Sequence, residues 1–403
     1  SVAAASRHRV SPERQPRRQV RILDVACHGN DPRIAAFAID SPQRGDVSPG
    51  AGIEISGWVI GEREPVVGVR ILNHDQMGTT HPLDVPRPDV AGDYPALPLA
   101  RKSGFLCWTG LAAEVGETSL VVQAILADET SIDLATVRLD LTAVEIETGP
   151  DFRLVDRPDF LIIGTQRGGT TSLHAYLGAH SQITLPETKE IHYLTDRHAR
   201  GEDWYRGQFP ARLPAGYLTG EATPYALFHP LAPRRLAQTA PDAKLIVLLR
   251  NPVERAYSHY LMERQRGDEP LDFAAALDAE ATRLAGEEAR LVTDPAYASR
   301  PHKHFSYQAR GDYTHQLRRW FATFPQEQML ILRSEDLYAR TADTFTTVTA
   351  FLGLPPGEDI PFAVYNRNTG PPLSPAMRER LVAHFAPANA ALAELLGWDS
   401  GWT

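Results

Sequence analysis

Cysteine is scarce in this sequence: its 403 residues include only Cys27 and Cys107. The two lie far apart and match neither a zinc-binding nor a redox spacing. A disulfide framework is therefore excluded, and we expect both cysteines to be buried free thiols. Long hydrophobic runs are also missing, because the longest, such as Leu245–Leu249, are far too short to cross a bilayer.

An excess of positive charge is missing too. The formal net charge of −9 argues against broad nucleic-acid binding, which needs a basic face, but it leaves room for a local basic pocket that binds an anion. The Arg-rich N-terminus lacks the apolar core of a secretory signal. We therefore expect residues 1–19 to be a basic disordered leader and the protein to be cytoplasmic, without a membrane partner.

The length predicts two or three domains, at roughly 100–200 residues per domain. Residues 20–145 have the pattern of an all-β domain, in which short alternating segments are separated by turns rich in Gly, Pro and Asp. The predicted strands are Gly52–Ile60, Val66–Leu72, Leu120–Ala127 and Ala135–Leu141. This pattern predicts an antiparallel sandwich of accessory or binding role, followed by a linker over residues 146–157.

The pattern changes at residue 158. Nearly continuous apolar strands, predicted at Phe160–Gly164, Lys244–Leu249 and Gln328–Leu332, alternate with amphipathic helices. Strands of this kind are typical of a parallel sheet with helices on both faces. Residues 158–403 are therefore predicted to be an α/β catalytic domain with a P-loop-like sheet.

A glycine-rich turn, Thr165–Leu173 (TQRGGTTSL), follows the first of these strands and begins a helix. Backbone N–H groups and the helix dipole make such a turn an anion site. The spacing from Gly164 to Gly169 fits the start of a Walker A loop, but Thr170 replaces its lysine. The cation lies inside the loop, as Arg167, which argues against a nucleoside triphosphate bound with magnesium.

A second anion site is predicted after the strand Lys244–Leu249. Arg250 stands at the carboxyl end of this strand, where ligands bind in α/β sheets. Asn251 is a good N-cap for the next helix, and Ser258 on that helix is expected to face back toward Arg250.

These motifs resemble those of the sulfotransferases that use 3′-phosphoadenosine 5′-phosphosulfate (PAPS), especially the heparan sulfate branch and bacterial relatives. The resemblance covers about Pro158 to Trp402. Ile162–Leu173 is similar to the family's 5′-phosphosulfate loop, although the family usually has lysine where Arg167 stands, and arginine keeps the charge but not the geometry. The resemblance implies donor contacts from Thr165, Gln166, Arg167, Gly168, Gly169, Thr170, Thr171 and Ser172.

The resemblance also implies roles for residues outside the loop. Arg250 and Ser258 match the pair that holds the 3′-phosphate. Tyr313, in a stretch similar to the one that closes over the nucleotide, and Arg367 are expected to contact the donor as well. The acceptor is expected to be a small molecule or carbohydrate, by preference a carbohydrate or a glycosylated natural product. The product nucleotide would be adenosine 3′,5′-bisphosphate.

The segment Pro186–Asp196 (PETKEIHYLTD) is similar to the family's catalytic segment. By this resemblance Glu190 is the general base, assisted by His192, and enclosure is expected to raise the pKa of Glu190. The reaction would be an in-line displacement in which Arg167 stabilises the leaving group. We expect no metal to be required, because arginines and backbone dipoles supply the positive charge.

Two other functions are weighed against this one. A P-loop small-molecule kinase would need the Walker lysine and an acidic magnesium ligand. A non-catalytic protein that binds a sugar or partner through the sandwich would leave the anion sites unexplained. His302 and His304 are expected to be solvated.

Overall fold

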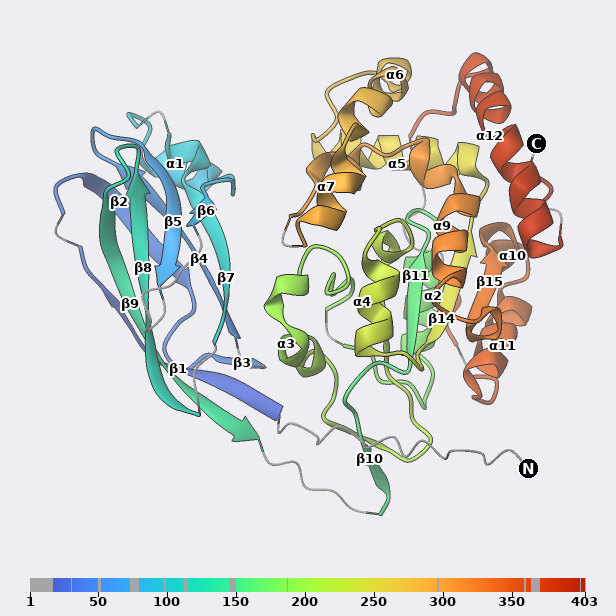
Figure 1. The fold of residues 1–403 in the computed structure, drawn as a ribbon, viewed down its shortest axis with the longest axis horizontal. Coiled ribbons are helices and arrows are strands. Elements are labelled where there is room, and N and C mark those ends of the chain that lie inside the picture. Colours follow the sequence, from blue (N-terminus) through green and yellow to red (C-terminus); the bar gives the residue numbers. More distant parts are fainter. Residues whose placement is uncertain are drawn as a thin grey trace, which may run out of the picture. The chain divides into compact units, whose positions relative to one another are not determined.

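The structure, a computed structural model, describes residues 17–29, 31–49, 52–72, 80–97, 99–111, 115–144, 150–186, 188–295, 297–358, 360–363, 370–398 and 400–402. The chain divides into two units, one up to Glu147 and the other from Thr148 (Figure 1). No helix among the described residues combines the length and the hydropathy of a membrane span.

The first unit is a sandwich of two antiparallel sheets. One sheet has the order β3-β1-β9-β8-β5-β6 and the other β2-β4-β7. The strands are β1 (Arg17–Cys27), β2 (Ile34–Ser41), β3 (Val47–Pro49), β4 (Gly52–Gly61), β5 (Val66–Leu72), β6 (Thr80–Pro82), β7 (Gly104–Gly110), β8 (Gly116–Leu126) and β9 (Ser131–Val144). The predicted β-sandwich is therefore confirmed.

Alternation builds the core of the sandwich. Along β9, Val137, Leu139 and Leu141 point inward and are fully buried, with more polar residues between them. They share one apolar core with Val20 of β1 and Ile55 of β4, which come from the two sheets. Only side chains two apart in a strand share a face, so this spacing turns one side of each sheet inward.

Two predicted boundaries are wrong. Strand β1 begins at Arg17, inside the expected leader, because Val20 and Ile22 are buried while β1 pairs with β9. The expected linker over residues 146–157 contains β10 (Phe152–Leu154), which pairs with β12 (Arg212–Pro214) of the second unit. Residues 1–16 lie outside the described residues.

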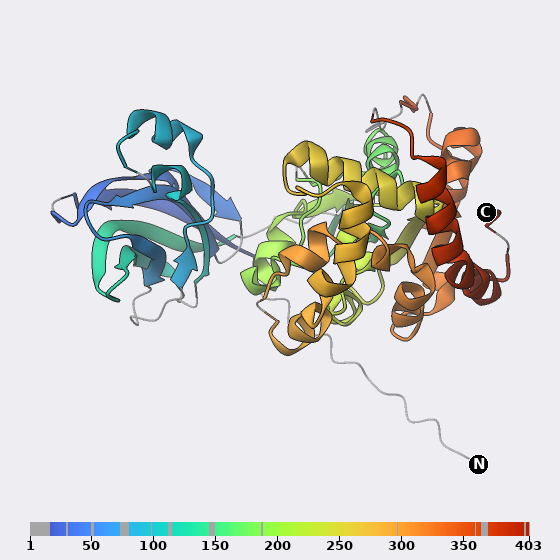
Figure 2. The same ribbon diagram turned by 90° about the horizontal axis from the view of Figure 1, so that it is seen from above.

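The second unit is built on a parallel sheet of order β13-β11-β14-β15, as predicted. Its strands are β13 (Gly220–Ala222), β11 (Phe160–Gly164), β14 (Lys244–Leu249) and β15 (Met329–Arg333). Every residue of β11 is buried, as expected for a strand covered on both faces. Helices α2 (Thr170–Gly178) and α11 (Thr341–Leu352) share an apolar core with one face, and helices surround the sheet in both views (Figure 2).

The sandwich also contains the helix α1 (Pro88–Asp93). The remaining described α-helices of the second unit are α3 (Glu202–Gly207), α4 (Ala232–Thr239), α5 (Pro252–Arg266), α6 (Phe273–Leu284), α7 (Glu287–Thr293), α8 (Arg300–His304), α9 (Tyr313–Phe321), α10 (Ser334–Ala339) and α12 (Pro375–Leu396). The predicted cap of α5 is confirmed, since the Asn251 side chain accepts a hydrogen bond from the Val253 N–H. The segments after β11, β13 and β14 leave the sheet at the same edge.

Candidate active site

The loop between β11 and α2 depends on two glycines. A Cβ on Gly168 would lie 2.7 Å from the carbonyl oxygen of Leu248, which is too close for any side chain. Gly169, the residue before α2, has a φ of +95°, a conformation that other residues rarely adopt. The loop can therefore bend tightly against β14 and bring its backbone to the start of α2.

Arg167 joins this loop to the second predicted anion site. Its Nε donates to Ser258 Oγ at 2.9 Å, and Arg250 Nη1 donates to its carbonyl oxygen at 2.9 Å. Arg167 itself has a left-handed φ of +68°, a costly conformation for a non-glycine residue that is often kept for function. The two anion sites predicted separately thus form one cluster at the carboxyl ends of β11 and β14.

A pocket of about 690 Å³ opens beside this cluster. It brings together residues from the loop, the Glu190 segment, α5, α8 and the stretch before α9. The lining residues are Gln166, Arg167, Gly169, Thr170, Thr171, Glu190, His192, Pro224, Tyr225, Arg250, Met262, Gln265, Arg266, Lys303, His304, Arg310 and Tyr338.

Some predicted donor contacts do not line the pocket. Thr165, Gly168, Ser172 and Ser258 are not among the lining residues. Tyr313 is buried and its hydroxyl donates to the Arg250 carbonyl at 2.7 Å, so it supports Arg250. Arg367 lies outside the described residues.

Positive charge dominates the pocket. The cations that line it are Arg167, Arg250, Arg266, Lys303 and Arg310, and Glu190 is the single carboxylate among the described lining residues. Burial, then the charges of Arg250 and Arg266, lower the pKa of Arg167. Burial likewise lowers the pKa of Arg310 to about 10. Both shifts reflect the cost of burying positive charge, which a bound anion would offset.

Glu190 lies in the pocket between Lys189 and His192. Lys189 Nζ donates to its Oε1 at 2.6 Å, and His192 Nε2 lies 3.6 Å from its Oε2. Burial alone would raise the pKa of Glu190, but the contacts with His192 and Lys189 outweigh it and lower the pKa to about 2. The expectation of a raised pKa is therefore wrong. Glu190 is ionised at neutral pH, and both Glu190 and His192 have left-handed backbones, with φ of +62° and +61°.

A buried carboxylate that the sequence analysis did not single out supports this segment. Glu221 of β13 accepts hydrogen bonds from the Tyr205 and Thr223 hydroxyls, each at 2.6 Å. Thr223 Oγ1 in turn accepts from the His192 backbone N–H at 3.3 Å. This chain of contacts ties the unusual backbone of the segment to the sheet.

Several lining residues were missed because they are distant in sequence from the motifs. Arg266, Lys303 and His304 come from helices α5 and α8, whose convergence the sequence does not show. Arg310 lies in the stretch similar to the family's nucleotide-closing segment, which was the available signal. It donates to the Gln166 side chain and to the carbonyl of Lys303, the latter at 2.8 Å.

The expectation of solvated histidines is wrong for His302. This residue is buried, its Nδ1 lies 2.8 Å from the Tyr225 hydroxyl, and its ring stacks on Phe228 at 4.2 Å. His304, two residues later, reaches the pocket instead. The short helix α8 therefore turns one histidine into the core and the other toward the candidate site.

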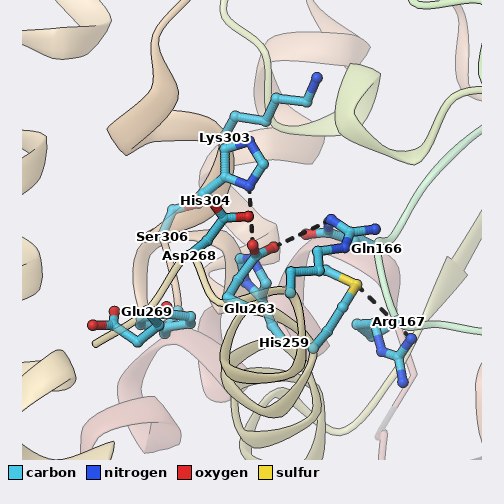
Figure 3. A network of polar contacts seen from close by, with 12 residues as sticks. Gln166, Arg167, His259, Glu263, Asp268, Glu269, Lys303, His304 and Ser306 are labelled. Atoms are coloured by element: carbon cyan, nitrogen blue, oxygen red, sulfur yellow. Dashed lines mark hydrogen bonds and ion pairs between the residues drawn. The ribbon is translucent and has the colours of Figure 1, made fainter. Parts of the chain in front are cut away.

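Glu263, Asp268 and His304 are close enough to consider a metal ion, since one ligand atom of each lies within 4.8 Å of the others (Figure 3). Their charges are already balanced, however. Arg300 lies 2.6 Å from Asp268, and Arg266 lies 3.6 Å from Glu263. With cations also lining the adjoining pocket, this group fits hydrogen bonding within the protein better than it fits a further cation.

Comparisons with known proteins agree on one family. The sequence model described as "Sulfotransferase domain" matches residues 157–364, just over half of the 403-residue chain. The chain is 28% identical over 318 residues to "Membrane-associated sulfotransferase kil1" of Dictyostelium discoideum, covering 62% of this chain and 67% of that protein. It is 28% identical over 291 residues to the mouse "Heparan sulfate glucosamine 3-O-sulfotransferase 6", covering 66% of this chain and 79% of that protein.

A second group of relatives matches over a smaller share of their length. The human "Bifunctional heparan sulfate N-deacetylase/N-sulfotransferase 2" is 31% identical over 207 residues, which are 49% of this chain and 22% of that protein. Among solved structures, a sulfotransferase from Alicyclobacillus acidocaldarius is 31% identical, with a TM-score of 0.48. The match covers 61% of this chain and 98% of that one.

Proposed function

Because the chain belongs to the sulfotransferase family, we propose that it transfers a sulfuryl group from PAPS to a hydroxyl of an acceptor held in the same pocket. The observation that carries the proposal is the junction of Arg167, Arg250 and Ser258 at the carboxyl ends of two parallel strands. It places two cations and the start of a helix around one pocket, as a donor with several anionic groups requires.

The donor fits the charge of this cluster. The loop amides and Arg167 would hold the 5′-phosphosulfate, while Arg250 and Ser258 would hold the 3′-phosphate. Tyr313 would act through the Arg250 backbone, to which it is hydrogen-bonded. The lowered pKa values of Arg167 and Arg310 support an anionic occupant, because burial is the largest cause of both and an anion would offset the cost of burying positive charge.

The chemical step would be an in-line displacement at sulfur. The acceptor oxygen forms a bond to sulfur as the bond between sulfur and the phosphate oxygen breaks, and the electron pair leaves with adenosine 3′,5′-bisphosphate. Glu190, ionised and exposed in the pocket, would take the acceptor's proton, with His192 beside it. Arg167 and the loop amides would stabilise the charge on the departing phosphate.

The acceptor class rests on the relatives. Two of them are named for heparan sulfate, and we propose on this basis that the acceptor is a carbohydrate or a glycosylated metabolite. Incubation with labelled PAPS and cell extract, followed by mass spectrometry of the labelled products, would identify it.

We propose that the sandwich is an accessory unit which the chemistry does not need. All residues lining the pocket fall between Gln166 and Tyr338, inside the second unit. Because β10 pairs with β12, the fragment for the test is residues 148–403. If that fragment folds but does not bind adenosine 3′,5′-bisphosphate, the sandwich contributes to the donor site.

A thermal-shift experiment separates this function from that of a kinase. Adenosine 3′,5′-bisphosphate should raise the melting temperature of the full chain in excess EDTA, since the pocket supplies the positive charge itself. ATP with magnesium should stabilise it little. The opposite pattern would favour the kinase and contradict the proposed donor.

A further inference from the structure

A second pair of a carboxylate and an imidazole lies at the pocket. It differs from Glu190 and His192 because its carboxylate is buried and only its imidazole lines the pocket. Glu263, on α5, is completely buried, whereas His304, at the end of α8, lines the pocket. His304 Nδ1 lies 3.0 Å from Glu263 Oε2, and Figure 3 shows this contact between the two helices. The imidazole is thus attached through one nitrogen to a group that no ligand can reach.

The state of the carboxylate decides which nitrogen carries the hydrogen. Burial alone would raise the pKa of Glu263, but the hydrogen bond with His304 and the close approach of His259 at 3.5 Å outweigh it and lower the pKa to about 2. An ionised carboxylate can only accept, so a neutral His304 must donate from Nδ1. Its Nε2 then carries a lone pair, on a side chain that lines the pocket.

The other charged groups near His304 are already engaged. Lys303 donates to Asp196, Asp268 pairs with Arg300, and Arg310 donates to the carbonyl of Lys303. Arg266 lies 3.6 Å from the second oxygen of Glu263, which reinforces the negative charge of that carboxylate. None of these contacts uses His304 Nε2.

We propose that His304 Nε2 accepts a hydrogen bond from the acceptor substrate, and that Glu263 is the positioning residue that keeps this nitrogen free of hydrogen. The inference rests on the proposed sulfuryl transfer and adds a contact for its acceptor. Phosphate and sulfate oxygens of the donor only accept hydrogen bonds, so they do not match a lone pair. The donor's adenine amino and ribose hydroxyl groups could match it, and the nucleotide affinity of His304→Phe tells them apart from the acceptor. An O–H or N–H group of the acceptor does.

The consequence is a requirement on the acceptor. It carries a hydrogen-bond donor besides the hydroxyl that Glu190 deprotonates, because one group does not serve both contacts. Polyhydroxylated molecules such as sugars meet this requirement, and simple phenols do not. His304 is therefore a specificity-determining residue for the acceptor.

Nitrogen-15 NMR of the full chain tests the positioning role without any substrate. The protein is treated with EDTA, because a metal ion bound to a ring nitrogen would also shift the nitrogen resonances. The spectra are recorded at pH 8, where a free imidazole is neutral. His304→Gln identifies the resonances. We expect hydrogen on Nδ1 in the wild type and a mixture of tautomers in Glu263→Gln. Hydrogen on Nε2 in the wild type would overturn the proposal.

Glu254→Gln is the matched control, because it makes the same change on the same helix at a residue that pairs with Arg378 instead. It should leave the His304 tautomer unchanged. If it disturbs the tautomer as much as Glu263→Gln does, Glu263 is not the positioning residue.

His304→Phe tests the contact with the acceptor. The affinity for adenosine 3′,5′-bisphosphate should stay within about twofold, whereas KM for a desulfated heparin tetrasaccharide, or for the acceptor found in extract, should rise roughly two- to tenfold with kcat less affected. A large loss of nucleotide affinity, or an unchanged KM, would contradict the proposal. Failure of the proposed function looks different, since the wild type would then not bind the nucleotide at all.

Discussion

Two pairs of the same residue types contribute to one pocket in different ways: Glu190 and His192 both line it, whereas of the second pair only His304 does. In the first, the Glu190 side chain is 39% exposed and the His192 side chain 14%. In the second, Glu263 is 0% exposed and His304 21%. Glu190 lies in an irregular segment after β11 and α2, whereas Glu263 lies on the inner face of α5. The fold therefore decides whether such a pair offers its carboxylate to the pocket or only its imidazole.

Both carboxylates have a pKa lowered to about 2, but by different partners. Glu190 interacts with His192 and Lys189, its neighbours in sequence, and keeps its side chain in the pocket. Glu263 interacts with His259 and His304, which come from two helices, and its side chain is buried from solvent. We infer that the first pair is suited to taking a proton and the second to orienting an imidazole.

The largest effect is expected from Glu190→Gln. The substitution keeps the size of the side chain but removes the base, so kcat should fall at least about a hundredfold, the lower end of what general bases contribute. Affinity for adenosine 3′,5′-bisphosphate should be nearly intact. Steady-state transfer and calorimetric titration measure the two quantities separately. Near-normal kcat in this variant would remove Glu190 as the base.

Arg250→Ala is expected to have the next largest effect, on the binding of the sulfuryl donor in the pocket that both pairs adjoin. A charge-assisted phosphate contact contributes about 1.5–3 kcal/mol, so the dissociation constant of adenosine 3′,5′-bisphosphate should rise very roughly tenfold to a hundredfold. Titration calorimetry measures it, with a thermal melt to show that the variant folds. An unchanged constant in folded protein would exclude Arg250 from the donor site.

Local chemistry explains what the sequence could predict. The strand Phe160–Gly164, its glycine turn and the cap at Asn251 are each encoded by adjacent residues, and all three lie where they were predicted. Ser258 was predicted to face Arg250. Its hydrogen-bond partner in the structure is Arg167 of the glycine-rich loop, to which Arg250 also donates.

Tertiary convergence explains what the sequence could not predict. Arg266 and His304 line one pocket with the loop because α5 and α8 both reach it, and no spacing in the sequence encodes that convergence. The pKa of Glu190 was expected to rise with enclosure. It falls because Lys189 and His192 lie against the carboxylate, a geometry that depends on left-handed backbone at residues 190 and 192.

His192→Ala should have a smaller effect than the loss of the base it assists. His192 lies 3.6 Å from Glu190 and helps to hold the carboxylate, but Lys189 still donates to it at 2.6 Å. We expect kcat to fall no more than about tenfold, less than the range typical of a general base. If His192→Ala is inactive while Glu190→Gln is active, the two roles are reversed and Glu190 orients the histidine.

The smallest effect is expected in the acid dependence of stability, where the buried carboxylate should differ from the exposed one. The folded-state pKa of Glu263 is about 2, below its ordinary value of 4.5, so its contribution to the free energy of unfolding is fully present above pH 4.5. It is lost as the pH falls toward 2, because the unfolded state takes up a proton first. Glu263→Gln lacks this contribution.

The stability advantage of the wild type over Glu263→Gln should therefore shrink by roughly 0.7 kcal/mol between pH 5 and pH 4, as linkage predicts for a group of this kind. Urea unfolding at the two pH values measures the difference. Glu190→Gln, treated in the same way, should show less change, because solvent screens its exposed carboxylate. An advantage that stays constant for Glu263→Gln would mean that its carboxyl is not stabilised as an anion in the folded protein, and the two pairs would then differ in charge as well as in exposure.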